Sequence, residues 1–368
     1  MTVLIFTLGL LWSSSLVAGN FSYDGELGPD HWGEQYPACL GKTQAPINIV
    51  LKDVVDASYP PLEFSNLENP HKTNIMNNGH TVMIRNLGPD APAVSGGPLN
   101  DTYNFLQMHF HWGQYDGIGA ETRIENQTFS LEMHAVLWKK GYGTSDEAMN
   151  HEDGLTVLAY LFQVTDEPNP VFESMVSQLP EVAGVGTNTT FNDNNLLNRL
   201  LGQVLPTEQT YFTYKGSLTT PPCSEIVQFI NFGKVQSISH DQLQAFRSLR
   251  SIDGGNITHN YRPLQPINGR GVYRNVPAED TFSKPTNKLE NSGTSAPSDA
   301  GTSEATTAVK GTVTPSWKPE VTTNKPNMEV TPSLKPRDDS YYEHSGQSTW
   351  TVSPLAVIAG VVALLTYH

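Results

Sequence analysis

Short apolar runs, separated by clusters of glycine, proline and asparagine, fill the chain from about residue 20 to residue 276. Most of these runs have the length of a strand and are rich in β-branched or aromatic residues, which favours β-structure. Clear examples are Thr81–Arg85, Phe129–Trp138, Leu155–Val164 and Ile226–Phe232. The pattern predicts a mainly β domain.

Signals for helices are few in the same region. Asn169–Leu179 and Phe191–Leu205 have compatible patterns, and Ser239–Arg250 begins with a serine that can cap a helix. We therefore predict a small number of helices at the periphery of the β-structure.

The two ends of the chain differ in composition from the region between them. Residues 1–19 contain a short apolar run that ends in small residues, which is typical of a secretory signal peptide, although basic residues before the run are missing. Residues 278–349 are rich in Ser, Thr, Pro and charged side chains, and they hold too little apolar surface to offset the entropy of ordering. We predict a folded domain over 20–277 and a disordered stalk, open to O-glycosylation, over 278–349.

Residues 350–368 form an apolar C-terminal segment whose core, Leu355–Leu365, is short for a membrane span. A polar spacer and small residues precede it, and no basic residue follows the core. This order predicts a signal for a glycosylphosphatidylinositol (GPI) anchor, with Ser345 and Gly346 as candidate attachment residues. The protein would then be tethered to the extracellular face of the plasma membrane. The alternatives are a single transmembrane helix or a secreted protein.

The net charge of −15 at pH 7 argues against nucleic acid as a partner, because nucleic acid would require a basic surface. An acidic surface is most simply a solubility feature. Contact with cations or mineral outside the cell is the alternative, but no acidic repeat argues for it.

Secretion makes the cysteine content informative. In an oxidising compartment the two cysteines of the chain, Cys39 and Cys223, most simply form one disulfide, although the sequence does not prove the pairing. The chain-entropy model gives a crosslink over so long a loop a stabilisation of about 4–5 kcal/mol. In a secreted chain the Asn-x-Ser/Thr sequons favour surface loops and are candidates for N-glycosylation: Asn20, Asn100, Asn126, Asn188 and Asn256.

Three histidines lie in two of the strand-like segments. Alternation along a strand turns His109 and His111 to the same face, and a neighbouring strand can bring His134 against them. Three neutral imidazoles converging on one point describe a zinc site with an open fourth position, which is the arrangement of a catalytic site. The alternative is three ordinary histidines on apolar strands, since eleven histidines in 368 residues make chance placements easy.

The neighbours of these histidines favour the metal site. Gln107 precedes His109 by two positions, and Glu132 precedes His134 by two, so that each lies on the same strand face as its histidine. A metal-bound imidazole usually donates its other N–H to such an acceptor, which fixes the tautomer.

Further motifs are spread over residues 21–276, which is the whole predicted folded part: Gly28–Gly33, Gln44–Asn48, Asn77–His80, Phe105–Gly113, Asp116–Glu121, Leu131–His134, Gly216–Pro222 and Asn260–Pro263. In their order and spacing throughout, these segments resemble those of the α-carbonic anhydrases.

This resemblance implies an α+β fold with a large twisted, mostly antiparallel central sheet and helices on its surface. It implies Zn²⁺ as the cofactor, bound by His109, His111 and His134 in a conical cleft. The implied activity is the reversible hydration of carbon dioxide to bicarbonate and a proton. Zinc-bound hydroxide attacks carbon dioxide, and His80 shuttles the proton. Sulfonamide-type inhibitors are expected to bind.

The resemblance also implies roles for residues around the zinc. Gln107, Glu132 and the backbone carbonyl of Asn260 would hold the ligating histidines, and the pair Glu121 and Thr219 would orient the hydroxide. Thr220 would help to hold bicarbonate. The apolar wall for carbon dioxide would be formed by Val136, Val157, Leu218 and Val227. Tyr23 and Asn78 would order the water on the path to His80. Cys39 and Cys223 match the disulfide of the extracellular members.

Two positions depart from the commonest pattern of the family. Thr122 stands where many members have a histidine, which weakens the expected support of Glu121. Phe229 stands where a tryptophan usually closes the apolar wall, and the smaller ring would alter the fit of inhibitors more than the chemistry. A catalytically silent binding module on the same fold is the rival interpretation. Such modules usually lack a zinc ligand, whereas all three histidines are present here.

Overall fold

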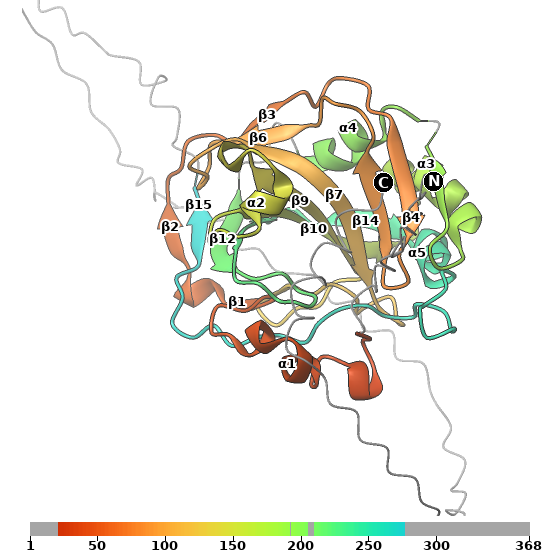
Figure 1. Ribbon diagram of the computed structural model, residues 1–368, viewed down its shortest axis with the longest axis horizontal. Coiled ribbons are helices and arrows are strands. Elements are labelled where there is room, and N and C mark those ends of the chain that lie inside the picture. Colours follow the sequence, from red (N-terminus) through yellow and green to blue (C-terminus); the bar gives the residue numbers. More distant parts are fainter. Residues whose placement is uncertain (1–20, 192, 205–209, 277–368) are drawn as a thin grey trace, which may run out of the picture. The chain divides into compact units, whose positions relative to one another are not determined.

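The computed structural model describes residues 21–191, 193–204 and 210–276 (Figure 1). The predicted signal peptide, Asn20, the stalk and the C-terminal segment with Ser345 and Gly346 therefore lie outside the described residues. No helix within the described ranges is long and apolar enough to cross a membrane.

One large mixed sheet dominates the described residues. Its central path has the strand order β11-β4-β5-β7-β9-β10-β13-β12-β15-β2, while β3, β6 and β14 pair beside this path and β1 pairs with β8 in a separate small sheet. The strands are β1 (Asn48–Ile49), β2 (Val55–Ala57), β3 (Glu63–Ser65), β4 (Thr73–Asn77), β5 (Val82–Asn86), β6 (Ala93–Ser95), β7 (Tyr103–Trp112), β8 (Arg123–Ile124), β9 (Leu131–Lys139), β10 (Leu155–Thr165), β11 (Asn188–Thr190), β12 (Tyr211–Gly216), β13 (Val227–Phe232), β14 (Gln236–Ser239) and β15 (Tyr273–Asn275).

Most neighbouring strands in the large sheet are antiparallel. The parallel pairs are β10 with β13, β10 with β14, and β15 with β2. The predicted fold class is therefore confirmed, and the four strands expected from the apolar runs appear within one or two residues of the expected bounds as β5, β9, β10 and β13.

The helices are shorter than the sequence pattern suggests: α1 (Trp32–Gln35), α2 (Ser145–Ala148), α3 (Glu173–Gln178), α4 (Leu196–Leu201) and α5 (His240–Arg247). The expected helix Asn169–Leu179 is divided into a 3₁₀ turn over Pro170–Phe172, α3, and a second 3₁₀ turn that begins at Leu179. Of the expected helix Phe191–Leu205, α4 and a following 3₁₀ turn are described. The Ser239 cap is confirmed, because its side chain accepts a hydrogen bond from Gln242 in a capping box at the start of α5.

The two faces of the central strands have different surroundings. Met108, Phe110 and Met133 belong to a large apolar cluster that also includes leucines of α4 and Phe246 of α5. Because side chains alternate along β7 and β9, the histidines between these residues point to the opposite face. Helices therefore cover one face of the sheet, and the other face is available for a site.

The crosslink predicted from the two cysteines is confirmed. Cys39 and Cys223 form a disulfide that joins positions 184 residues apart and packs against Phe21 and Trp32. It ties the N-terminal part of the described chain to the loop between β12 and β13.

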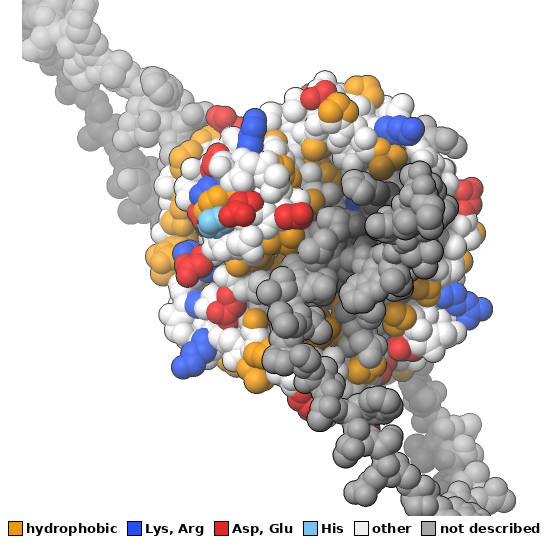
Figure 2. Space-filling view, viewed as in Figure 1, with side chains coloured by type: hydrophobic (Ala, Val, Ile, Leu, Met, Phe, Trp, Pro, Cys, Tyr) orange, Lys and Arg blue, Asp and Glu red, His pale blue; other side chains and the backbone are white. Residues whose placement is uncertain are grey.

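On the face seen in Figure 2, the described residues carry acidic and basic side chains interspersed with apolar ones. The asparagines of the four described sequons, Asn100, Asn126, Asn188 and Asn256, are all exposed. Each is therefore accessible to a glycosylating enzyme.

Candidate metal centre

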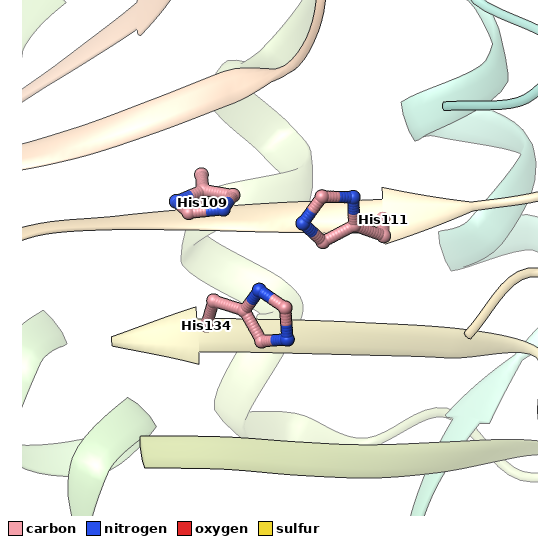
Figure 3. Close-up of side chains that lie close together, drawn as sticks. All are labelled: His109, His111 and His134. Atoms are coloured by element: carbon pink, nitrogen blue, oxygen red, sulfur yellow. The ribbon is translucent and has the colours of Figure 1, made fainter. Parts of the chain in front are cut away.

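The three predicted histidines meet on adjacent strands. His109 and His111 lie on β7, His134 lies on β9, and the antiparallel register pairs His109 directly with His134. Their candidate ligand atoms all lie within 4.8 Å of one another, and the three rings surround a common space (Figure 3). The spacing that the sequence suggested therefore produces one cluster of imidazoles rather than three separate side chains.

Hydrogen bonds select the nitrogen that each ring presents to this space. His109 donates from Nδ1 to Gln107 Oε1 at 2.9 Å, which leaves Nε2 available. His134 donates from Nε2 to Glu132 Oε1 at 2.8 Å, which leaves Nδ1 available. Both acceptors are the residues expected from the sequence.

The third ring is held by a residue far away in the sequence. His111 donates from Nδ1 to the backbone carbonyl of Asn260 at 2.8 Å, and the Asn260 side chain accepts a hydrogen bond from the Trp112 backbone at 2.7 Å. His111 Nε2 is buried and has no hydrogen-bond partner among the described residues. A buried polar atom without a partner is uncommon, so this nitrogen fits a ligand that the site is built to hold.

The chemistry of the donor set fits zinc. Burial, together with the charges of the other two histidines, holds the pKa of His109 well below its usual range, and burial also lowers the pKa of His111. These imidazoles are therefore neutral and have lone pairs to donate. Three imidazole nitrogens suit a four-coordinate zinc ion that keeps one position open.

Glu132 is fully buried and is supported by Thr122. The Thr122 backbone N–H and hydroxyl donate to the two carboxylate oxygens at 2.7 and 2.9 Å. Burial opposes the charged form of Glu132, but the charge and hydrogen bond of His134 prevail and lower the pKa of the carboxyl. Thr122 therefore acts on the partner of His134, whereas the sequence comparison had connected this position with Glu121.

Glu121 is buried beside the histidines. Its Oε1 accepts a hydrogen bond from the Arg262 backbone N–H at 2.8 Å and lies 3.5 Å from His111 Nδ1. Its Oε2 lies 4.0 Å from His134 Nδ1, the nitrogen available to a metal. The carboxyl thus lies next to the metal position without belonging to the set of ligands.

The pKa of the Glu121 carboxyl is raised to about 7. Burial is the main cause and the charge of Glu132 adds to it, while His134, the Arg262 backbone N–H and the nearby Thr219 hydroxyl act in the opposite direction. Thr219 therefore lies close to Glu121, and the buried Oε2 of Glu121 has no hydrogen-bond partner among the described residues.

A cleft with about 820 Å³ of empty space opens next to the histidines. The expected residues Val136, Val157, Leu218, Thr219 and Thr220 line it. Phe229 and Leu155 also line it, and the sequence analysis did not assign a role to Leu155. Val227 is buried in the same apolar cluster but is not among the lining residues, so it supports the wall from behind.

His80 lies at the side of this cleft and is only 6% exposed. Its ring stacks on Phe21, with 4.0 Å between ring centroids and an interplanar angle of 9°. Burial lowers the pKa of His80 to about 4, and the charge of Asp253 offsets part of that effect. Tyr23 and Asn78 line the cleft nearby, as expected. Phe21 was missed, because an aromatic residue beside the predicted cleavage site carries no signal of a contact with residue 80.

Comparison with known proteins agrees with the geometry. Residues 27–276 match the family model described as eukaryotic-type carbonic anhydrase. Carbonic anhydrase 7 of Homo sapiens is 38% identical over 259 residues, which cover 68% of this chain and 96% of that protein. Carbonic anhydrase 1 of Monodelphis domestica is 36% identical over 263 residues, which cover 69% of this chain and 97% of that protein. Carbonic anhydrase 4 of Oryctolagus cuniculus is 35% identical over 276 residues, which cover 73% of this chain and 85% of that protein.

Proposed function

Because this chain belongs to the eukaryotic-type carbonic anhydrase family, whose activity is the hydration of carbon dioxide, we propose that it is itself an active, zinc-dependent enzyme of this kind. The observation that carries the proposal is the convergence of His109 Nε2, His111 Nε2 and His134 Nδ1 on one space. In each ring a hydrogen bond to a separate acceptor engages the other nitrogen.

Zinc held by these histidines would supply a Lewis acid that activates water at neutral pH, a role for which carbonic anhydrases are the standard example. The Thr219 hydroxyl would donate to the nearby Glu121 carboxylate, and the lone pairs of the hydroxyl oxygen would then orient the reacting oxygen. An ionised Glu121 accepts this hydrogen bond best. The positive charge of a zinc ion bound by the neighbouring histidines would favour the ionised form, against the effect of burial.

The apolar wall suits a small uncharged substrate. Val136, Val157, Leu218 and Phe229 line the cleft beside the histidines and exclude water from that side. Carbon dioxide has no hydrogen-bond donor, so it loses little by leaving water for such a surface. The polar side chain of Thr220, on the same lining, would help to hold the bicarbonate product.

His80 is proposed as the proton shuttle. It lines the same cleft as the three histidines, and its buried Nε2 has no hydrogen-bond partner among the described residues. Neutral imidazole can accept a proton through water in the cleft. Because burial lowers its pKa to about 4, His80 would hold that proton only weakly and would need an acceptor close by.

Stopped-flow measurement of carbon dioxide hydration tests the function. We expect measurable hydration by the purified protein, loss of activity after dialysis against a strong chelator, and recovery on adding one equivalent of zinc. An aromatic sulfonamide should inhibit the zinc-loaded form. A protein that contains stoichiometric zinc and yet fails to hydrate carbon dioxide would support the silent binding module instead.

We further propose that the enzyme acts outside the cell and is attached to the plasma membrane by a GPI anchor. A formed disulfide and four exposed sequon asparagines suit an oxidising, secretory environment. The composition of residues 278–368 suits a stalk followed by an anchor signal.

Treatment of intact cells that express the full chain with phosphatidylinositol-specific phospholipase C should release most of the surface activity into the medium. The anchor holds the protein only through lipid, so cleavage of the lipid frees it. A variant that carries a known transmembrane helix in place of residues 350–368 is the control and should stay on the cells. Equal retention of both proteins, together with no incorporation of labelled ethanolamine, would favour the single transmembrane helix.

A further inference from the structure

His80 lines two cavities, the main cleft and a second cavity with about 500 Å³ of empty space. Among the described residues, Tyr23 is the other residue that lines both. His80 is therefore placed where a proton taken up in the main cleft can be passed on to groups of the second cavity.

The two cavities differ in the acceptors that they offer. No carboxylate is found among the described residues that line the main cleft, whose walls are apolar side chains, hydroxyls, amides and histidines. The second cavity is lined by Asp24 and Asp253, together with His259 and several hydroxyl groups. A proton that leaves His80 therefore finds carboxylate acceptors in the second cavity, whereas the described lining of the cleft offers hydroxyls, amides and the three histidines of the metal centre.

Several contacts hold His80 in this position. The stack on Phe21 covers one face of the ring, the His80 backbone N–H donates to Asn78 Oδ1 at 2.9 Å, and the Asn260 side chain donates to the His80 backbone carbonyl at 3.0 Å. As long as the ring keeps this stack, its proton passes to a neighbouring group or to water that reaches the ring.

Asp253 is the carboxylate best placed to take it. Its Oδ2 accepts hydrogen bonds from Ser22 Oγ at 2.8 Å and from Ser251 Oγ at 3.4 Å, so its orientation is fixed. The residue is exposed, which gives it contact with bulk solvent. Its negative charge is also felt at His80, where it favours the protonated ring. Asp24 is less free, because it lies 3.4 Å from His259 Nε2 in an ion pair.

We propose that the second cavity is the exit route for the proton from His80 and that the Asp253 carboxylate is its next acceptor. The N–H bond of the imidazolium breaks, and an O–H bond forms on Asp253, either directly or through water in the cavity. The carboxylic acid then loses the proton to bulk solvent, so that both groups return to their starting states. A polar cavity of this size has room for water with several partners. This inference rests on the proposed function, since it requires His80 to be the shuttle.

Burial also makes His80 a ready proton donor. It lowers the pKa of the imidazole to about 4, so this ring gives up a proton more easily than an exposed histidine would.

The test is the variant Asp253→Asn, which keeps an oxygen acceptor for Ser22 but cannot take a proton. With the zinc-loaded enzyme, we expect kcat for carbon dioxide hydration at low buffer concentration to fall about threefold to tenfold, the range that up to one pKa unit of driving force allows. Because kcat/KM reports steps before proton release, it should not change, and added imidazole should restore kcat. The exposed carboxylate variant Asp90→Asn is the matched control and should behave as the unmodified enzyme.

The variant His80→Ala, alone and combined with Asp253→Asn, separates the possible failures. If Asp253 acts through His80, His80→Ala lowers kcat at low buffer concentration and the double variant shows no further loss. A normal kcat for Asp253→Asn beside a lowered kcat for His80→Ala would overturn the exit route and leave the shuttle intact. The exit route would also be overturned if the fold-loss of kcat in the double variant equalled the product of the two separate fold-losses, as independent effects require. A normal kcat for His80→Ala would overturn the shuttle itself, and a fall in kcat/KM for Asp253→Asn would indicate a structural role instead.

Discussion

Replacing His109 with alanine is expected to abolish both zinc retention and carbon dioxide hydration. The substitution removes one of three ligand nitrogens and also leaves the Gln107 side chain without the ring that it holds. Loss of an outer partner of a metal ligand typically costs 10-fold to 100-fold, so loss of a ligand itself should reduce activity by more than about 100-fold. Metal analysis after gel filtration and stopped-flow hydration would measure the two effects.

A control and a stability measurement make this result specific. His31→Ala removes an exposed histidine whose ring contacts Glu34, and it should leave both zinc content and activity unchanged. Zinc binds only the folded protein, so added zinc should raise the melting temperature of the unmodified protein and of His31→Ala but not that of His109→Ala. Full activity in a zinc-free His109→Ala protein would refute the site.

Removing the disulfide is expected to have the largest effect on stability. In the double variant Cys39→Ala/Cys223→Ala the unfolded chain regains the freedom of a loop whose ends are 184 residues apart. The chain-entropy model sets the loss at about 4–5 kcal/mol, a large part of the 5–15 kcal/mol by which domains are usually stable. Urea unfolding followed by fluorescence should therefore show a much lower midpoint than that of the unmodified protein.

Reduction of the unmodified protein provides the comparison for this experiment. A thiol reductant should lower the midpoint of the unmodified protein toward that of the double variant and should not affect the double variant. While folded, the variant should keep its kcat/KM, because neither cysteine lines the cleft beside the histidines. If the free energy of unfolding differed by only a few tenths of a kcal/mol, the crosslink would not constrain the unfolded chain as the model assumes.

Local sequence patterns were sufficient for much of the fold. Short apolar runs located the central strands, because a strand that is buried on both faces presents a continuous run of apolar residues. The helical patterns overestimated the length of the helices. Asn169–Leu179 contains Pro170, which begins a 3₁₀ turn, and a second such turn starts at Leu179. Local pattern does not distinguish a continuous helix from a series of short turns that pack in the same place.

Part of the candidate site could also be predicted from patterns within single strands. His109 and His111 share a face by alternation alone, and Gln107 and Glu132 reach their histidines within one strand, so all four could be recognised without a structure. The role of Thr122 was misplaced, because its distance to Glu132 depends on how the loop before β9 folds back.

By itself, therefore, the sequence determined what depends on local periodicity and residue type: the strands, the face shared by His109 and His111, the acceptors beside the ligands and the two cysteines available for a crosslink. Tertiary structure alone decided which residues from distant segments meet. It brought Asn260 to His111, Phe21 to the His80 ring and Asp253 to a cavity that His80 also lines. The physical reason is that these contacts depend on strand register and loop closure across 59 to 173 positions in the chain, and no pattern of neighbouring residues encodes such distances.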